Sequence, residues 1–348
     1  KMTDIEKGIY QSHINKPRTI LQQLCCHPII AESFKSMMGN QEINLDEIKE
    51  ALIEENNTKI LKYTLRLEKL VSTNPEYAML KKKYTEIINE SKYMLKVLNN
   101  ITEIQNSETN FDENCSICLN EIDKPTITPC GHIFCNECIK MCLNYKKKCP
   151  MCKQSLKDKE IYLINQNNES KKNVINPFIE KYGSKLGKLI CLCRKLVTNK
   201  DNRIIIFSQW DGMLSLIGKT LSDNEVSNTF VKGNVWCRNK SIKRFKKGDD
   251  TRVIMLSLSN AASGTNLTEA SHIIFVEPID SNYKTIKAIE GQAIGRACRL
   301  GQDKIVKVYR ILTRNTIEEE IYKNYDPEYV NPKEIEIDDM DLEIPVEI

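Results

Sequence analysis

The feature that most constrains this chain is a cluster of cysteine and histidine side chains within residues 115–152. A Cys-x2-Cys pair opens the cluster, a second one closes it, and a Cys-x-His-x2-Cys-x2-Cys run lies between them. The eight side chains are Cys115, Cys118, Cys130, His132, Cys135, Cys138, Cys149 and Cys152. Soft thiolates and an imidazole arranged in four pairs are what two tetrahedral zinc ions require, and no coordination position is left for water. The spacing therefore predicts two structural zinc ions.

The remaining composition is that of a soluble protein in a reducing compartment. The chain has 14 cysteines, and no apolar segment typical of a signal peptide follows Lys1. No apolar run approaches the roughly 18 residues that span a bilayer, so no membrane partner is expected. Hydrophobic residues make up 41% and charged residues 28% of the 348 residues, which suits two or three globular domains. The start at Lys1 also agrees with a fragment of a longer chain.

Charge is distributed unevenly along the chain. Residues 326–348 contain nine acidic residues and one lysine, so this acidic tail carries a net charge of −8. Because the whole chain carries +4, residues 1–325 carry +12. A basic body is compatible with a polyanionic partner, but lysines on solvated helix faces are the more common cause.

The first 110 residues are expected to be helical. We assign residues 1–43 to a helical segment and residues 44–110 to a helical hairpin arm. Apolar residues recur at heptad-like spacing on both sides of the turn, at Ile60, Tyr63, Leu67 and Leu70 and then at Leu80, Tyr84, Ile87, Met94, Leu98 and Ile101. Pro75 suits the first position of the second helix, with Thr73 or Asn74 as its cap.

Strands and helices are expected to alternate in the C-terminal part. Residues 161–183 are expected to be a linker, and residues 184–325 an α/β domain. Short apolar runs at 203–207, 253–256, 272–276 and 305–312 read as buried strands separated by helix-length segments. This pattern predicts a parallel sheet with helices on both faces, whose ligands bind at the carboxyl ends of the strands.

The stretch EGQAIGRACRLGQ, residues 290–302, carries two arginines three residues apart. We expect a helix here that places the guanidinium groups of Arg296 and Arg299 on one face, with Gly295 reducing the bulk beside the first. Forked donors of fixed charge suit phosphate oxygens. Taken alone, the pattern also fits a solvated helix face.

Residues 112–157, within the domain assigned to 111–160, resemble the RING finger. The resemblance implies two cross-braced zinc sites, one formed by Cys115, Cys118, Cys135 and Cys138 and the other by Cys130, His132, Cys149 and Cys152. A zinc ribbon, in which neighbouring pairs share a zinc, is an alternative that the spacing leaves open.

The RING resemblance also implies ubiquitin ligase activity. RING fingers lack a nucleophile and dock a ubiquitin-conjugating enzyme in a shallow apolar groove, whose positions match Ile117 and Pro150. The position after the last ligand often carries an arginine that clamps ubiquitin, and here it is Lys153. Because lysine cannot make the same forked contact, a weaker clamp is expected.

Three stretches of residues 184–325 resemble motifs IV, V and VI of the Swi/Snf-related, superfamily-two DNA-dependent ATPases. They are RIIIFSQWDGMLSLIGKTL, VIMLSLSNAASGTNLTEASHIIFVEP and QAIGRACRLGQDKIVKVYRILTRNTIEEEIY. MTDIEKGIYQSH and LQQLCCHP near the start also resemble the segment after the family's third motif. The inserted RING and the VEP sequence narrow the resemblance to the subgroup of the SNF-histone-linker-PHD-RING helicase and the helicase-like transcription factor.

This resemblance implies roles for particular residues of a second RecA-like lobe. Arg296 and Arg299 match the arginine fingers that reach ATP and magnesium bound on a first lobe, and Gln292 belongs to the same motif. Residues that match the coupling of nucleotide state to DNA are Gly264, Asn266, Ser257 and Ser259. The chain departs from the family pattern in AASGTNL, which replaces a more glycine-rich loop, and at Cys298, where histidine is usual.

No first lobe is recognisable in the sequence. GMLSLIGKT resembles a P-loop, but Gly212 and Gly218 are six residues apart where the motif needs five. The expected function is therefore the C-terminal half of a DNA translocase or helicase combined with a RING ubiquitin ligase. Its expected partners are double-stranded DNA or chromatin, a ubiquitin-conjugating enzyme, ubiquitin and a first lobe in cis or in trans.

The sequence leaves two alternative functions open. The first is a non-catalytic scaffold or stand-alone RING ligase with a degenerate helicase lobe, and the second is zinc-dependent DNA reading by the RING itself. The family implies a nuclear location, or a viral replication site if the source is viral.

Overall fold

The structure is a computed structural model that describes residues 2–14, 16–31, 45–70, 75–106, 114–128, 132–153, 155–156, 161–163, 176–247, 251–260 and 265–325. The chain divides into two compact units. Among the described residues, unit 1 contains residue 2, residues 18–31 and those from 176 onward, and unit 2 contains residues 3–14, 16–17 and those from 45 to 163. The expected cap at Thr73 or Asn74 and the acidic tail 326–348 lie outside the described residues.

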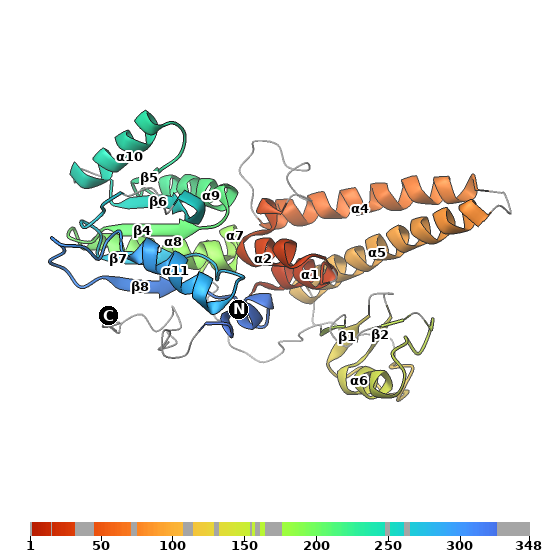
Figure 1. Cartoon of the computed structure of the whole chain (residues 1–348). Coiled ribbons are helices and arrows are strands. Elements are labelled where there is room, and N and C mark those ends of the chain that lie inside the picture. Colours follow the sequence, from red (N-terminus) through yellow and green to blue (C-terminus); the bar gives the residue numbers. More distant parts are fainter. Residues whose placement is uncertain are drawn as a thin grey trace. The chain divides into compact units, whose positions relative to one another are not determined.

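Unit 1 is built on a five-stranded sheet in the order β5-β6-β4-β7-β8 (Figure 1). All four strand pairings are parallel. The strands are β4 (Ile204–Ser208), β5 (Asn228–Phe230), β6 (Val253–Ser257), β7 (His272–Phe275) and β8 (Lys307–Arg310). The three central strands are buried at every position, which explains their uninterrupted apolar runs.

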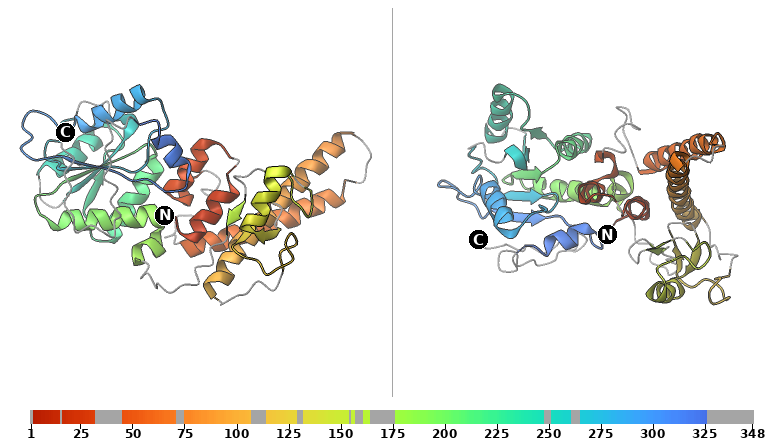
Figure 2. Two further views of the ribbon diagram at one scale, coloured as in Figure 1. Left: turned by 90° about the horizontal axis from the view of Figure 1, so that it is seen from below. Right: turned by 45° about the vertical axis from the view of Figure 1, so that its right-hand side comes forward.

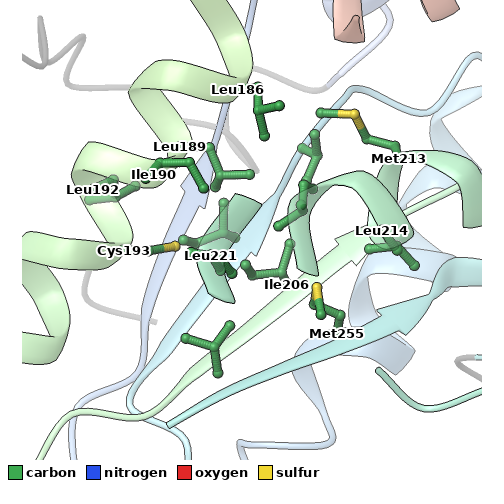
Figure 3. Close-up of a cluster of buried hydrophobic side chains, with 14 of the residues drawn as sticks. Leu186, Leu189, Ile190, Leu192, Cys193, Ile206, Met213, Leu214, Leu221 and Met255 are labelled. Atoms are coloured by element: carbon green, nitrogen blue, oxygen red, sulfur yellow. The ribbon is translucent and has the colours of Figure 1, made fainter. Parts of the chain in front are cut away.

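Helices cover both faces of this sheet, so the expected α/β fold is confirmed. The helices are α7 (Pro177–Tyr182), α8 (Ser184–Thr198), α9 (Asp211–Asp223), α10 (Val235–Lys247), η3 (Leu258–Asn260), α11 (Tyr283–Ile294) and α12 (Ile317–Tyr322). In Figure 2 (left), the green helix α8 and the blue helix α11 lie on opposite sides of the sheet. Ile206 and Met255 face the side chains of α8 and α9, as Figure 3 shows. Ile205 and Phe207 point to the other face, where they pack with residues of α10 and α11.

An N-terminal segment of the chain completes unit 1. It comprises α2 (Arg18–Cys26) and η1 (Pro28–Ile30). The Arg18 guanidinium donates two hydrogen bonds to the Asp280 carboxylate, at 2.9 and 3.2 Å. Cys26 and Ile30 are buried in the same core cluster as α8 and α9. The segment assigned to 1–43 is therefore divided, because residues 3–17 belong to unit 2.

A pair of long helices forms the arm of unit 2. These are α4 (Leu45–Glu68) and α5 (Pro75–Asn106), and α1 (Asp4–Ser12) packs on α5. The two long helices run side by side in opposite directions (Figure 1), with the rings of Tyr63 and Tyr84 5.3 Å apart. Met94 and Leu98, which the heptad-like spacing selected, are buried. The expected helical arm is confirmed.

The small cysteine-rich part of unit 2 contains a three-stranded sheet and one helix. The elements are β1 (Pro125–Ile127), β2 (Ile133–Cys135), α6 (Asn136–Tyr145) and β3 (Tyr162–Leu163). The sheet order is β2-β1-β3, with antiparallel pairings. Its small core includes Phe134, Ile139, Leu143 and Leu156.

Some segments differ from the expected boundaries. The range 161–183 contains β3 and α7 in addition to residues outside the described part, because β3 pairs with β1 and α7 packs on α8. The last strand is shorter than the expected 305–312, since only Lys307–Arg310 pairs with β7. Among the described residues, no helix combines the length and apolar character needed to cross a membrane.

Candidate functional site

Four cysteines of the predicted zinc cluster converge in the structure. The sulfur atoms of Cys115, Cys118, Cys135 and Cys138 all lie within 4.8 Å of one another. The Sγ atoms of Cys118 and Cys135 are 3.8 Å apart. Four sulfurs placed at about 2.3 Å around one zinc would be separated by about 3.8 Å, so this group has the size of a tetrahedral zinc site.

A second group brings together His132, Cys149 and Cys152. The Cys149 Sγ and His132 Nδ1 atoms are 3.5 Å apart, close to the about 3.5 Å expected for a sulfur and a nitrogen on one tetrahedral zinc. Cys130, the fourth ligand that the RING resemblance implies, lies outside the described residues. The groups combine the first pair with the third, and His132 of the second pair with the fourth, which is the pairing of the cross-braced arrangement and not of the ribbon alternative.

The residues expected to dock a conjugating enzyme flank the zinc ligands. Ile117 and Pro150 are half-buried, and Ile117 packs against the small core of this domain. Nearby in the sequence, Leu119 is 75% and Met151 55% exposed. Lys153 is exposed, and its Nζ donates to the Pro150 carbonyl oxygen at 2.6 Å. The domain therefore displays apolar side chains beside both metal-ligand groups.

The expectation that the two arginines lie on a helix is wrong. Helix α11 ends at Ile294, and Gly295 is its C-cap. Beyond it the chain tightens into turns, in which the N–H groups of Arg296 and Ala297 bond to carbonyl oxygens three residues earlier. A Cβ at Gly295 would lie 3.0 Å from the Gly291 carbonyl oxygen, so glycine suits this tight exit from the helix.

The two arginines have different surroundings. Arg296 is only 3% exposed, and its Nη1 donates to the Thr265 carbonyl oxygen at 3.1 Å. Its Nε is buried with no hydrogen-bond acceptor among the described residues. Burial, followed by the charge of Arg299, lowers the pKa of Arg296. Arg299 is exposed, and its Nε donates to the Gly295 carbonyl oxygen at 2.9 Å.

The segment after β6 lies against residues 295–299, which we call the arginine turn. The Leu267 N–H donates to the Arg296 carbonyl oxygen at 2.8 Å, and the neighbouring Asn266 is exposed. Gln292 is exposed on the last turn of α11. Gly264 lies outside the described residues. The structure thus brings Arg296 together with residues 265–267.

The two candidate serines lie at the carboxyl end of β6. Ser257 ends this strand and is buried, whereas Ser259 is exposed. Their hydroxyl oxygens are 2.8 Å apart. Only Ser259 therefore offers a hydroxyl at the surface.

A buried ionic network near the carboxyl ends of β4 and β7 was not identified from the sequence. The Lys185 Nζ lies 2.5 Å from the Glu318 Oε1, and both side chains are at most 1% exposed. Burial alone would lower the pKa of Lys185, but the Glu318 carboxylate raises it overall. Lys185 lies beside the apolar helical run LGKLICLC, but Glu318 is one of three consecutive glutamates, so no clear sequence signal marked this pair.

Glu277 belongs to the same network. Its carboxylate accepts hydrogen bonds from the Ser208 hydroxyl at 2.9 Å and the Gln209 N–H at 2.5 Å. Burial raises the pKa of Glu277 to about 7, although the Gln209 N–H and Lys185 oppose this shift. The signal for a buried acid was its position directly after the apolar run HIIFV. The network joins α8 and α12 to the carboxyl ends of the strands, where ligands bind in such folds.

The P-loop-like sequence GMLSLIGKT lies inside α9. A P-loop requires a turn that exposes several backbone N–H groups before a helix begins. In α9 most of these groups are used by the helix itself, so this segment does not form a phosphate cradle.

Two families of known domains match the chain. The helicase conserved C-terminal domain matches residues 186–301, and the C3HC4-type zinc finger, or RING finger, matches residues 114–152. The first match lies in unit 1 and the second in unit 2. The chain is therefore similar to a RING finger in one segment and to a helicase C-terminal domain in a later segment.

The curated relatives of this chain include proteins named as a ubiquitin ligase or as DNA repair proteins. The human E3 ubiquitin-protein ligase SHPRH is 30% identical over 217 residues, which cover 60% of this chain and 12% of the relative. The Saccharomyces cerevisiae DNA repair protein RAD5 is 27% identical over 333 residues, or 87% of this chain and 26% of the relative. The Arabidopsis thaliana DNA repair protein RAD5A is 31% identical over 211 residues, or 59% of this chain and 20% of the relative. The chain spans only about an eighth to a quarter of these proteins.

One solved structure covers most of the chain. The C-terminal part of the Fun30 ATPase domain aligns with 93% of this chain and 86% of its own, at a TM-score of 0.42 and 18% identity. The fold assignment rests on the strand order and the family matches.

Proposed function

We propose that this chain, a member of the Swi/Snf-related helicases with an inserted RING finger, is the C-terminal half of an ATP-dependent DNA translocase or helicase that also acts as a RING ubiquitin ligase. The observation that carries the motor part is the arginine turn. Arg296 is held beside residues 265–267, and its buried Nε has no acceptor among the described residues. A buried donor without an acceptor is costly, and a phosphate oxygen of a bound nucleotide would supply one.

In this proposal the arginines complete a nucleotide site on a first lobe. Arg296 and Arg299 would supply fixed positive charge to phosphate oxygens of ATP, whose magnesium and adenine contacts belong to that lobe. The burial of Arg296 favours a strong interaction, because charges attract more strongly where water is excluded. The Arg296 contacts to residues 265–267 would connect the nucleotide with a segment that, in this proposal, would contact duplex DNA or chromatin.

The ligase part rests on the zinc-organised domain. The two ligand groups fix Ile117 and Pro150 beside them, where they would dock a ubiquitin-conjugating enzyme. The Lys153 ammonium is turned toward the Pro150 carbonyl oxygen, which supports a weak clamp on ubiquitin. The relatives named as DNA repair proteins support a nuclear location and a substrate on chromatin or at a replication fork.

The motor part is tested by ATP turnover with a first lobe present, in cis or in trans. We expect Arg299→Ala or Arg296→Ala to abolish DNA-stimulated ATP hydrolysis, since arginine fingers contribute about 10³–10⁵ in rate in other phosphoryl-transfer enzymes. Lysine at either position should restore little activity, because one ammonium cannot reproduce the fork. DNA affinity should change little, since many phosphate contacts contribute to it.

Arg314→Ala is the matched control, because Arg314 is an exposed arginine of the same unit. Arg299→Ala is the cleaner test, since Arg296→Ala also removes a buried hydrogen bond and its thermal unfolding must be measured alongside. Normal turnover in both alanine variants would reject the motor function. It would favour the alternative of a scaffold or stand-alone ligase with a degenerate helicase lobe.

A further inference from the structure

One face of α10 forms an open basic groove at the edge of the sheet in unit 1. The cavity has a volume of about 610 Å³ and is lined by Trp236, Asn239, Lys240, Lys243, Arg244, Lys247 and Thr251. We call these residues the α10 groove. Helix α10 lies against the edge strand β5 and the next strand β6 (Figure 1). No residue discussed above for nucleotide, zinc or conjugating-enzyme binding belongs to it.

Among the described residues, acidic side chains leave most of the charge of this helix unpaired. Residues 235–247 contain six lysines and arginines and no acidic residue. Lys246 pairs with Glu269, but this lysine is not part of the groove. For the four cationic side chains of the groove, no salt bridge to a described residue is found.

The spacing of the cations within the helix adds repulsion between them. Lys240 and Arg244 are four residues apart, as are Lys243 and Lys247, and like charges at this spacing repel. Cations in the last turn interact favourably with the helix dipole, which accounts for Arg244 and Lys247. It does not account for Lys240 and Lys243, one or more turns earlier.

The groove is rigidly supported from below. Phe245, on the opposite side of α10, is fully buried in the core of unit 1. The Arg203 guanidinium donates hydrogen bonds to the carbonyl oxygens of Phe245 and Lys246, which closes the C-terminal end of the helix. The cationic side chains therefore extend from a fixed helix.

An exposed tryptophan stands at the N-terminal end of the groove. Trp236 is 69% exposed, and the Lys240 Nζ lies 5.3 Å from the centre of its ring. Exposing so much aromatic surface is unfavourable in water, and flat aromatic rings are frequent where a protein binds a ligand. An indole beside a row of cations matches the way proteins bind unpaired nucleotides, whose bases stack on aromatic rings while cations contact the phosphates.

We propose that the α10 groove binds single-stranded nucleic acid, with Trp236 stacking on a base and Lys240, Lys243, Arg244 and Lys247 contacting the backbone phosphates. The face from Trp236 to Lys247 is about 16 Å long at 1.5 Å per residue, enough for a few nucleotides. Paired bases within a duplex do not offer a free face to a stacking indole, so the tryptophan favours a single strand. This site goes beyond the proposed motor and ligase functions and needs no first lobe.

The test uses the whole chain with zinc and an oligo-dT of about 20 nucleotides, longer than the usual site for one small domain. We expect binding that weakens with salt and quenches tryptophan fluorescence. Trp236→Ala should weaken binding about tenfold, which lies within the usual effect of losing one stacked base. Trp236→Phe should retain most of the affinity, because phenylalanine also stacks on bases. The quenching should be lost in Trp236→Phe, which leaves Trp210 as the remaining tryptophan.

The phosphate contacts are tested by the salt dependence of the same binding. Replacing Lys240, Lys243 and Lys247 together by alanine should reduce the slope of log affinity against log salt by about 2, at about 0.7 per phosphate contact. The matched control replaces Lys195, Lys200 and Lys219, three exposed lysines of the same unit, with the same change in net charge. Neither triple variant should unfold below the temperature of the parent, and the loss of repulsion within α10 would raise that of the first.

Three results would overturn the proposal. One is equal affinity and salt dependence in the two triple variants, and another is unchanged affinity in Trp236→Ala. The third is that a blunt duplex, or poly-glutamate as a polyanion without bases, binds as tightly as oligo-dT while oligo-dT itself does not quench tryptophan fluorescence. None of these outcomes bears on the arginine test, because the α10 groove contains neither Arg296 nor Arg299.

Discussion

At the residue scale, Ile117 connects the zinc-organised fold with the proposed ligase function. Its side chain is half-buried, so it packs on the domain core and still offers apolar surface to a partner. We expect Ile117→Ala to reduce the discharge of ubiquitin from a conjugating enzyme at least tenfold, since truncation of a hot-spot residue at an interface costs about 2 kcal/mol or more. Single-turnover discharge measures the effect, and an unchanged zinc content excludes unfolding. Equal discharge by parent and variant would contradict the docking role, and Ser116→Ala, an exposed neighbour, is the control.

At the scale of elements, the contact between α7 and α8 depends on a glycine. A Cβ at Gly187 would lie 2.5 Å from the Phe178 carbonyl oxygen and 2.7 Å from the Ile179 Cα, so the two helices would have to separate. We expect Gly187→Ala to destabilise unit 1 by about 1–3 kcal/mol, the usual range for overpacking. Gly291→Ala is the matched control, because a Cβ there meets nothing within 4 Å and alanine favours a helix by about 0.5–1 kcal/mol. Thermal unfolding should give opposite shifts, and a stabilised Gly187→Ala would contradict the close contact.

At the scale of the whole molecule, unit 1 and the cysteine-rich domain of unit 2 have different sources of stability. Unit 1 has large apolar clusters on both faces of its sheet, whereas the cysteine-rich domain has a small core. Structural zinc contributes about 10–16 kcal/mol in small domains, more than such a core provides. We expect elemental analysis to find two zinc ions per chain, and chelation to remove the amide-exchange protection of β1, β2 and α6 but not that of β4, β6 and β7. One zinc or none, or retained protection in α6, would contradict this prediction.

The sequence by itself determined those features that depend on neighbouring residues along the chain. Ligand spacing predicted the zinc cluster, since Cys-x2-Cys pairs reach one metal within a short loop. Uninterrupted apolar runs predicted the central strands β4, β6 and β7, because strands buried on both faces have no polar side. Heptad-like spacing predicted the arm, and the motif similarities predicted both family matches. The short strand β5 was missed, since three residues, NTF, leave no pattern to recognise.

Only the tertiary structure decided which distant residues share a site. Cross-bracing and ribbon pairing have the same ligand spacing, and only the folded chain separates His132 from Cys118 and joins it with Cys149. The end of α11 before Arg296, the burial of that arginine against Thr265 and the Lys185–Glu318 pair depend on packing between segments far apart in sequence. The α10 groove likewise required the core contact of Phe245, which determines the face of the helix that is exposed. Local spacing encodes short-range chemistry, whereas burial and charge pairing depend on which segments meet after folding.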